Sequence, residues 1–467
     1  MKNATSSIGG CEGEVMKDAC KLKATASSKS VEESGRLYRF FACTLAASLS
    51  CTGWTTPSFS QVTSPVISPA VPSEVPDNVP PPSTEELGIP LGSFRLYPTL
   101  DIRAGYDTNV FAQPAGQQTG SPYELISPSL QVRSDWNNHM LNFGAFGAFG
   151  FYNNATAQNY QNFGFNTDGR VDIQRDWNLS ASAAFTGTTE LLGTPDVAQS
   201  VSPSVVYAVP LSLSMFQRFN RLFYQATGTA TGLRYSDSSQ LNTSALPGGS
   251  RDRNEFGETL RAGYELYEGF DFWVQGGLNQ RSYLQYINVA GQQRDSSGWS
   301  MVGGSTLDLG GISKLEGFVG YTQQNYFNPG ITTGAVTFGL GGTWNGYHPL
   351  VVHPFVIRSI NETVFTNYQD YLSTTIGAEF IYTIQSDWQL NAGTSFSLLD
   401  YTPVPGTTGT FQHTDNFYRV SLGLLYSFRP QLQIGPLYEF SAGSGPDPNT
   451  SPNFTRHTIM LRLVAKQ

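Results

Sequence analysis

The sequence has 467 residues, and only 13% of them are Asp, Glu, Lys or Arg, about half of the roughly 25% that is usual in soluble globular proteins. Mean hydropathy is nevertheless -0.24, because small polar residues and 48 glycines offset an aromatic content of 13%. With a formal net charge of -9, this composition argues against chain-wide disorder, a coiled coil and a basic nucleic-acid-binding protein.

Residues 1–60 have the features of a long N-terminal region with a secretory signal. Arg36 and Arg39 precede an apolar run at residues 40–49, and small residues follow up to Ser60. A basic flank, an apolar run of about ten residues and small residues predict export, whereas a membrane-spanning helix needs about 20 apolar residues. Met1 and Met16 are both candidate starts, and the cleavage site is left open.

Residues 61–92 are predicted to be a Pro-rich, disordered periplasmic linker, because their proline density favours an extended chain without a packed core. All four cysteines precede residue 52, so the exported chain is expected to contain none, as suits an oxidising compartment. These cysteines are Cys11, Cys20, Cys43 and Cys51.

From residue 93 onward, apolar and polar residues alternate. In residues 418–427, for example, Tyr418, Val420 and Leu422 alternate with Arg419 and Ser421. The same period of two is found in residues 94–104, 163–174 and 388–398. Such alternation predicts β-strands with one apolar and one polar face.

Two kinds of connection separate these strands. Short turns are expected near residues 135, 176, 218, 268, 310, 345, 387 and 429. Long polar loops are expected at 106–121, 152–160, 188–200, 236–252, 287–296, 326–332, 362–370, 401–414 and 443–453. Eight turns and nine loops join about 18 strands (16–18), with both termini on the short-turn side.

This pattern fits either a soluble β-sandwich or a membrane barrel. Even spacing, strict alternation of turns and loops, aromatics beside the turns and scarce charge favour the barrel. A sheet can span lipid only when it closes on itself, since every backbone donor must be paired. Residues 93–467 are therefore predicted to form an all-β, closed antiparallel transmembrane β-barrel.

A short motif near the start of the barrel resembles a known family. Residues 96–100, followed by Gly105, Tyr106, Asp107, Asn109 and Val110, are similar to the opening of the putative β-barrel porin type 2 family of alphaproteobacterial outer-membrane proteins. The resemblance implies an outer-membrane barrel and a porin-like function, but it implies no particular solute. The chain lacks the terminal aromatic residue of many such barrels, which bears on recognition by the barrel assembly machinery.

No catalytic or metal-binding pattern emerges, so the prediction is a protein without cofactor or metal that is not an enzyme. The five histidines lack metal-ligand spacing. His413 and Asp415 lie near serines, as chance allows in a Ser-rich loop. Asp107 and Asn109 could bind calcium, but a strand end leading into a loop is the favoured interpretation.

The polar face of the strands is the candidate pore lining. Opposed acids and bases there could create a transverse field in a wet pore, or they could be cross-strand pairs that fix the register. The candidates are Arg95, Asp101, Arg103, Arg133, Asp168, Arg170, Asp172, Arg261, Glu265, Arg281, Glu316, Glu379, Arg419, Glu439 and Arg462.

The leading hypothesis is passive diffusion of small hydrophilic solutes across a bacterial outer membrane, with lipid and lipopolysaccharide around the barrel and periplasmic termini. One alternative is polysaccharide export, in which Tyr97, Trp273, Tyr283 and Phe318 would stack on sugars. Another is a structural or adhesive barrel without an open pore. The sequence leaves open whether the pore is plugged, and it does not set the oligomeric state.

Overall fold

The computed structural model describes residues 88–238, 245–285, 291–310, 313–327, 331–347, 349–407, 410–447, 450 and 453–467. The expected signal, the cysteines, both candidate starts and the linker up to residue 87 lie outside the described residues. In the described ranges, no helix is long and apolar enough to cross a membrane. Their two short 3-10 segments, η2 (Thr156–Gln158) and η3 (Gly248–Ser250), lie in connections between strands.

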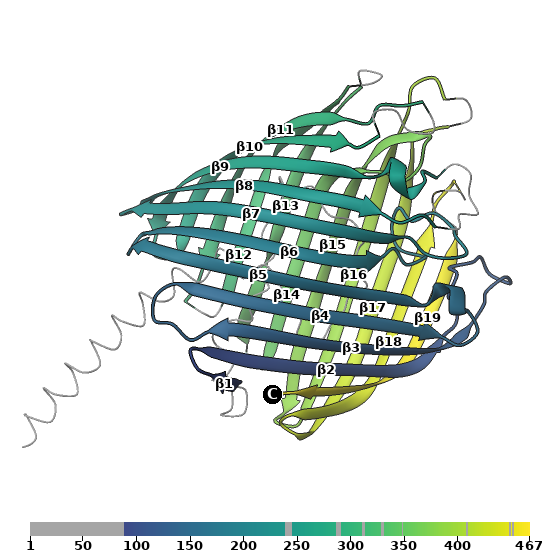
Figure 1. Ribbon diagram of the computed structural model, residues 1–467, viewed down its shortest axis with the longest axis horizontal. Helices are drawn as coiled ribbons and strands as arrows, with labels where there is room; N and C mark the ends of the chain where they lie inside the picture. Colours follow the sequence, from purple (N-terminus) through teal and green to yellow (C-terminus); the bar gives the residue numbers. More distant parts are fainter. Residues whose placement is uncertain are drawn as a thin grey trace, which may run out of the picture. The chain divides into compact units, whose positions relative to one another are not determined.

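The described residues form one 19-stranded sheet, of which the three-residue β1 (Ile89–Leu91) is a short addition to 18 long strands (Figure 1). The long strands are β2 (Phe94–Asp107), β3 (Ser121–Ser134), β4 (Met140–Tyr152), β5 (Tyr160–Gln174), β6 (Trp177–Thr189), β7 (Val205–Phe219), β8 (Leu222–Tyr235), β9 (Arg253–Tyr267), β10 (Phe270–Tyr283), β11 (Ser296–Asp308), β12 (Ser313–Tyr326), β13 (Thr332–Tyr347), β14 (Leu350–Glu362), β15 (Tyr368–Gln385), β16 (Trp388–Pro403), β17 (His413–Arg429), β18 (Leu432–Ser444) and β19 (Phe454–Lys466).

The sheet closes because its last strand pairs with its first long strand. Each strand from β2 to β19 pairs antiparallel with its neighbours in the chain, and β19 pairs with β2 from Thr458↔Asp107 to Lys466↔Thr99. The prediction of a closed antiparallel barrel of about 18 strands is confirmed. A barrel of this size encloses more space than the side chains of its own wall can fill.

The strand β1 lies in residues expected to belong to the linker. It pairs with residues 94–96 at the start of β2, on the edge that β19 leaves uncovered beyond Thr99. Gly92, with a φ of +59°, lies in the turn between β1 and β2. The barrel sheet therefore begins before residue 93, at Ile89.

Alternate residues of each strand expose apolar side chains on the outside of the barrel. Exposed aromatics gather toward both ends of the strands, as expected for the two interfaces of a membrane. Those near the long connections include Tyr106, Phe151, Tyr207, Phe256, Trp299 and Tyr321, and those near the short turns include Phe219, Tyr224, Tyr264, Trp344 and Trp388. This apolar outer surface, with aromatic side chains toward both ends, is suited to contact with membrane lipid.

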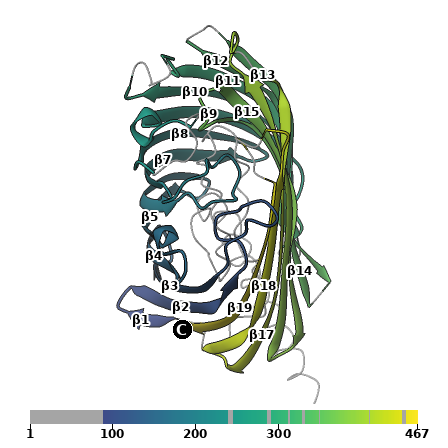
Figure 2. The same cartoon turned by 90° about the vertical axis from the view of Figure 1, so that its right-hand side faces the viewer.

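Several of the long connections fold into the barrel, and three of them supply most of the loop residues of one core. They are the β2–β3 connection (108–120), the β6–β7 connection (190–204) and the β14–β15 connection (363–367). Figure 2 shows the β2–β3 connection, in blue, inside the ring of strands. Their side chains form a hydrophobic core with inward-facing residues of β15–β17 and β19, so the three connections meet inside the lumen.

Candidate functional site: a constriction built from inward-folded connections

The sequence motif at the end of β2 directs the β2–β3 connection into the lumen. The Asp107 carboxylate accepts a hydrogen bond from the Asn109 backbone N–H at 2.8 Å. The side chain of Asn109 is fully buried; its amide donates to the carbonyls of Gln113 (2.8 Å) and Thr455 (2.9 Å), and its oxygen accepts from the Gln113 N–H (2.9 Å). Val110 follows at once and packs in a core beside β3–β5. The motif thus ties the connection to β19.

Arg456 of β19 extends this tie to a second connection. Its guanidinium donates to the carbonyls of Asn109 (2.8 Å), Val110 (2.9 Å) and Leu192 (2.9 Å). Because one planar group holds three carbonyls, the β2–β3 and β6–β7 connections are fixed relative to each other.

Glycine is required at two points of this arrangement. A Cβ at Gly105 would lie 1.9 Å from the Ile459 carbonyl oxygen, so the motif glycine permits the close approach of β2 and β19. Gly193 has a φ of +79°, and a Cβ there would lie 2.9 Å from the Ala112 Cβ. The absence of a side chain at residue 193 therefore permits the close approach of the β6–β7 connection to the β2–β3 connection. Tyr106, by contrast, faces outward and is exposed.

The core of the constriction joins three connections to the wall formed by β15–β17 and β19. Ala112, Leu192, Val364 and Phe365 come from the connections. They pack with the buried strand residues Tyr368, Tyr371, Leu399, Tyr401, Phe417 and Phe454. The β8–β9 connection joins them, because Ala245 pairs with Phe365 and the Leu246 N–H donates to the Val364 carbonyl at 2.8 Å.

Asp196 bridges the connections at the centre of this core. Its buried carboxylate, 3% exposed, accepts hydrogen bonds from the Thr363 hydroxyl (2.6 Å), the Val364 N–H (2.9 Å) and the Tyr401 hydroxyl (3.1 Å). Burial raises the pKa of Asp196 to about 7, against the lowering effect of these hydrogen bonds and of the Arg251 charge.

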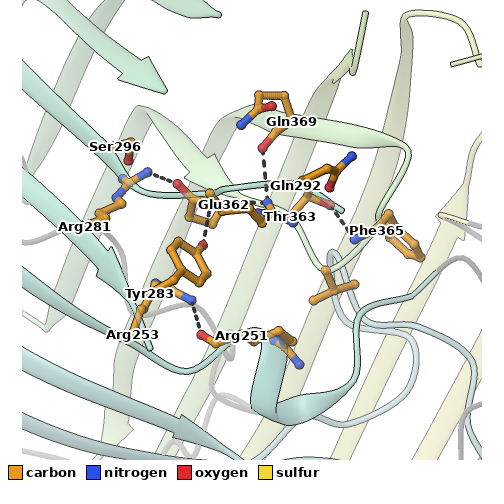
Figure 3. A network of polar contacts seen from close by, with 12 residues as sticks. Arg251, Arg253, Arg281, Tyr283, Gln292, Ser296, Glu362, Thr363, Phe365 and Gln369 are labelled. Carbon is orange, nitrogen blue, oxygen red and sulfur yellow. Dashed lines mark hydrogen bonds and ion pairs between the residues drawn. The ribbon is translucent and has the colours of Figure 1, made fainter. Parts of the chain in front are cut away.

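A network of paired charges borders the core (Figure 3). Glu362 at the end of β14 accepts from Arg281, from the Tyr283 hydroxyl (2.8 Å) and from Arg294 (3.2 Å). Arg253 pairs with Glu255 at 2.7 Å, and Arg251 pairs through two nitrogens with Glu190. These side chains are all largely buried, and the network joins four arginines to three glutamates. Arg281, a sequence candidate, is therefore part of an ion-pair network.

A small cavity lies between this network and the core. It is lined by the β6–β7, β8–β9 and β14–β15 connections and by the ends of β8, β9, β10 and β14. Its lining includes Glu190, Asp196, Arg251, Glu255, Tyr283 and Thr363.

All fifteen sequence candidates lie on the lumen side, opposite the exposed apolar residues of their own strands. Four of them form a cluster at the seam between β2 and β19. The Asp101 carboxylate contacts Arg103 (2.7 Å) and Arg462 (2.9 Å), and Arg103 lies 4.0 Å from Glu439. The cluster joins strands that are 361 residues apart in sequence at the Asp101–Arg462 contact.

Candidates in the half of the barrel nearer the short turns also form ion pairs. The pairs are Arg95–Asp135 (3.0 Å), Arg170–Asp172 (2.9 Å), Arg218–Glu265 (2.9 Å) and Arg261–Glu316 (3.1 Å). Asp168 accepts from the Asn142 amide, Arg133 lies over the Tyr97 ring, and Glu379 and Arg419 face the lumen from β15 and β17. This wall is polar and largely charge-paired.

Sequence reasoning missed the residues that build the constriction itself. Glu190, Asp196, Arg251 and Arg294 lie in connections, where no alternation indicates which way a side chain points. The strand residues it missed are Arg253, Glu255, Glu362 and Arg456, all within three residues of a strand end. The one usable signal was the opening motif, whose Asp107 and Asn109 now have a structural role.

The four lumen aromatics proposed to stack on sugars do not form an open track. The Arg261 guanidinium lies 3.8 Å from the centre of the Trp273 ring, which is 4% exposed, and Arg133 lies over Tyr97 at 5.1 Å. Phe318 is buried beside Trp273, and Tyr283 is held by Glu362. These contacts do not favour polymer export.

His413 and Asp415 come together, but not as a catalytic relay. His413 Nε2 lies 3.0 Å from the Thr450 hydroxyl and 3.4 Å from the Asp415 carboxylate, so one nitrogen faces both partners. A relay needs the acid and the hydroxyl on different ring nitrogens, whereas His413 Nδ1 faces the Phe411 carbonyl oxygen at 3.2 Å. Across the described ranges, no group of three or more His, Cys, Asp or Glu side chains could hold a metal ion.

Residues 81–467 match the model of the family described as "Putative beta-barrel porin 2". The chain belongs to this family. The porin is thus an outer-membrane β-barrel protein, and the resemblance carried by the opening motif is confirmed. Its family and fold indicate a transport channel rather than an enzyme.

Comparisons with individual proteins are less informative than the family match. No curated protein matches the porin sequence. Among solved structures, OpdO of Pseudomonas aeruginosa is 13% identical with a TM-score of 0.41, and the alignment covers 80% of the porin and 97% of OpdO. OpdK of the same organism is 12% identical with a TM-score of 0.42, covering 80% and 99%. These values are low, and the fold assignment rests on the strand pairing.

Proposed function

We propose that the porin is a channel for passive diffusion of small hydrophilic solutes across the outer membrane. The short turns, β1 and Gln467 would face the periplasm, as in other barrels of this kind. The observation that carries the proposal is the lumen wall, where ionised and amide side chains from every part of the barrel face inward while apolar residues face lipid. A polar wall admits hydrated solutes and disfavours apolar ones.

The inward-folded connections make this a channel for small solutes. They pack against both sides of the lumen and leave no open track of aromatic rings, which argues against export of a wide polymer. The polar wall also argues against a purely adhesive barrel, which would not need one. Lipopolysaccharide and the barrel assembly machinery are the partners that an outer-membrane location implies.

Planar-bilayer recording tests the proposal. The folded barrel is expected to give discrete ion-conducting steps, and liposomes containing it should swell faster in small sugars than in large ones. Heat-modifiable migration on a gel verifies that the barrel is folded. A folded barrel that carries no current and causes no swelling would contradict the channel function.

A further inference from the structure

We propose that the outer face of the barrel has a binding site for the phosphorylated sugar headgroup of lipopolysaccharide, at the point where β13 and β14 separate. Arg358 of β14 binds a phosphate of that headgroup, and the main-chain edge of β13 binds its sugar hydroxyls. The inference rests on the proposed function for the orientation of the barrel, in which the long connections, and with them this site, lie on the side of the outer leaflet.

The ladder of strand pairing is incomplete between β13 and β14. Among the described residues, these two strands share six residue pairs, whereas every other two neighbouring long strands share at least nine. The last pair on the side of the long connections is Phe338↔Arg358. Beyond it, residues 332–337 are paired with β12 alone, and residues 359–362 are paired with β15 alone.

The end of β14 leaves the wall and lies inside the barrel. Glu362, its last residue, contacts Arg281 of β10, although β11, β12 and β13 lie between β10 and β14 in the sheet (Figure 3). Ile360 and Asn361 are buried, whereas Val336 of β13 stays exposed on the outer face. The two strands therefore diverge beyond Arg358, and the edge of β13 at residues 332–337 has no neighbouring strand.

Arg358 itself points to the outside of the barrel. Paired residues of neighbouring strands point to the same side of a sheet, and Arg358 is paired with Phe338 and Thr374. These two lie two residues from Val336 and Ile376, which are exposed apolar side chains of the outer face.

The guanidinium of Arg358 has few partners within the protein. Its Nη1 donates to the Thr374 hydroxyl at 2.8 Å, and across the described ranges no carboxylate forms an ion pair with it. A guanidinium has five N–H donors, so most of them remain available to an acceptor from the membrane.

Arg358 lies where the outer face changes from apolar to polar. The neighbouring row of paired residues on the side of the short turns is apolar and aromatic, with Leu340, Val356, Ile376, Phe396 and Tyr418. The row of Arg358 also contains Thr374 and Asn416, and the next row contains Asp400 and Thr414. An arginine at this boundary can cover apolar surface with its methylenes and reach the lipid headgroups with its charge.

Two features of this site need a polar partner from the membrane. A charge on the outer face of a barrel is costly unless water or an opposite charge compensates it, and an open sheet edge is not tolerated in hydrocarbon. A phosphate can accept two hydrogen bonds from one guanidinium. Sugar hydroxyls both donate and accept, as the N–H and C=O groups of a strand edge require. A phosphorylated sugar supplies both kinds of group.

Native mass spectrometry of the full folded barrel in a non-ionic detergent tests the site, with bisphosphorylated lipid A as the probe. The native chain is expected to retain lipid A. Arg358→Gln should bind it at least about tenfold more weakly, because a hydrogen bond from a charged donor is lost. Arg358→Lys should lie between the two, since an ammonium keeps the charge without the planar fork.

Arg175→Gln is the matched control. Arg175 is exposed in the short turn between β5 and β6, so this variant loses the same charge at the other end of the barrel. It should bind lipid A as the native chain does. Dephosphorylated lipid A should bind equally to the native chain and to Arg358→Gln, because the phosphate contact is then absent from both. Heat-modifiable migration verifies that each variant is folded.

Three results would overturn the assignment. Equal affinity of Arg358→Gln and the native chain for lipid A would remove Arg358 from the site. An equally large effect of Arg358→Gln on the binding of phosphatidylglycerol would assign the arginine to anionic lipids in general. A native chain that is oligomeric without lipid, and monomeric as Arg358→Gln, would assign the surface to a second copy of the chain.

Bilayer conductance separates this inference from the channel proposal. Because Arg358 faces away from the lumen, Arg358→Gln should conduct as the native chain does. A barrel that binds lipid A through Arg358 but carries no current would support the site and contradict the channel. A conducting barrel whose binding of lipid A is unchanged by Arg358→Gln would refute the site and leave the channel proposal intact.

Discussion

Arg456 illustrates how much of the constriction depends on single side chains. Its guanidinium holds carbonyls from two connections, and its 3.7 Å contact with Asp107 adds an opposite charge. Hydrogen bonds from a charged donor each contribute about 1.5–3 kcal/mol. The arginine therefore stabilises the closed arrangement of the connections, while the barrel wall has its own hydrogen-bond ladder.

Arg456→Ala should loosen the constriction without unfolding the barrel. The three bonds share one guanidinium and their contributions do not add, so loss of these contacts is expected to destabilise the inward-folded connections by about 2–4 kcal/mol. Single-channel conductance should increase. Arg456→Lys should fall between the native and alanine values, because an ammonium cannot reproduce the planar fork. Arg95→Lys is the control, since its pair with Asp135 is largely exposed, and it should leave conductance unchanged.

Among the connections, the close contact between β6–β7 and β2–β3 depends on Gly193. Gly193→Ala should push the β6–β7 connection away from the β2–β3 connection, because the new Cβ would meet Ala112. Amide exchange of the β6–β7 connection should become faster. Gly291→Ala is a matched control, because Gly291 has a φ of +77° but no neighbour within 4 Å of its added Cβ. Equal effects of the two variants would mean that backbone strain alone is responsible.

The strands could be predicted from the sequence, whereas the inward folding of the connections into the lumen could not. Alternation in residues 418–427 indicated correctly which side chains of β17 face outward, because that pattern is local. The contact between Asn109 and Thr455 joins residues 346 apart, and nothing in either segment points to the other. The strand β1 was missed because three residues are too few to show a period. Asp196 was missed because a connection has no period at all.

The stability of the whole barrel depends on the separation of an apolar outer face from a polar lumen face. Leu260 near the middle of β9 is 62% exposed on the outer side, whereas its neighbour Thr259 faces the lumen. Leu260→Arg should destabilise the barrel in lipid vesicles by about 2–4 kcal/mol, as for a cation at the midplane of the membrane. Thr259→Arg should change stability much less, since its charge would reach water. Urea unfolding of both variants in vesicles measures the difference, and equal losses would refute the assigned faces.

The seam between β19 and β2 has a consequence for the order of assembly. β19 pairs with β2 through nine residue pairs, whereas β2 pairs with β3 through fourteen. The Asn109–Thr455 and Arg456–Val110 contacts cross the same seam. Since contacts between distant segments form late, the β2–β3 connection can be tied to β19 only after the first and last strands have met. A nascent barrel would therefore lack this contact until its circumference is complete, and the fixing of the β2–β3 connection would mark the end of closure.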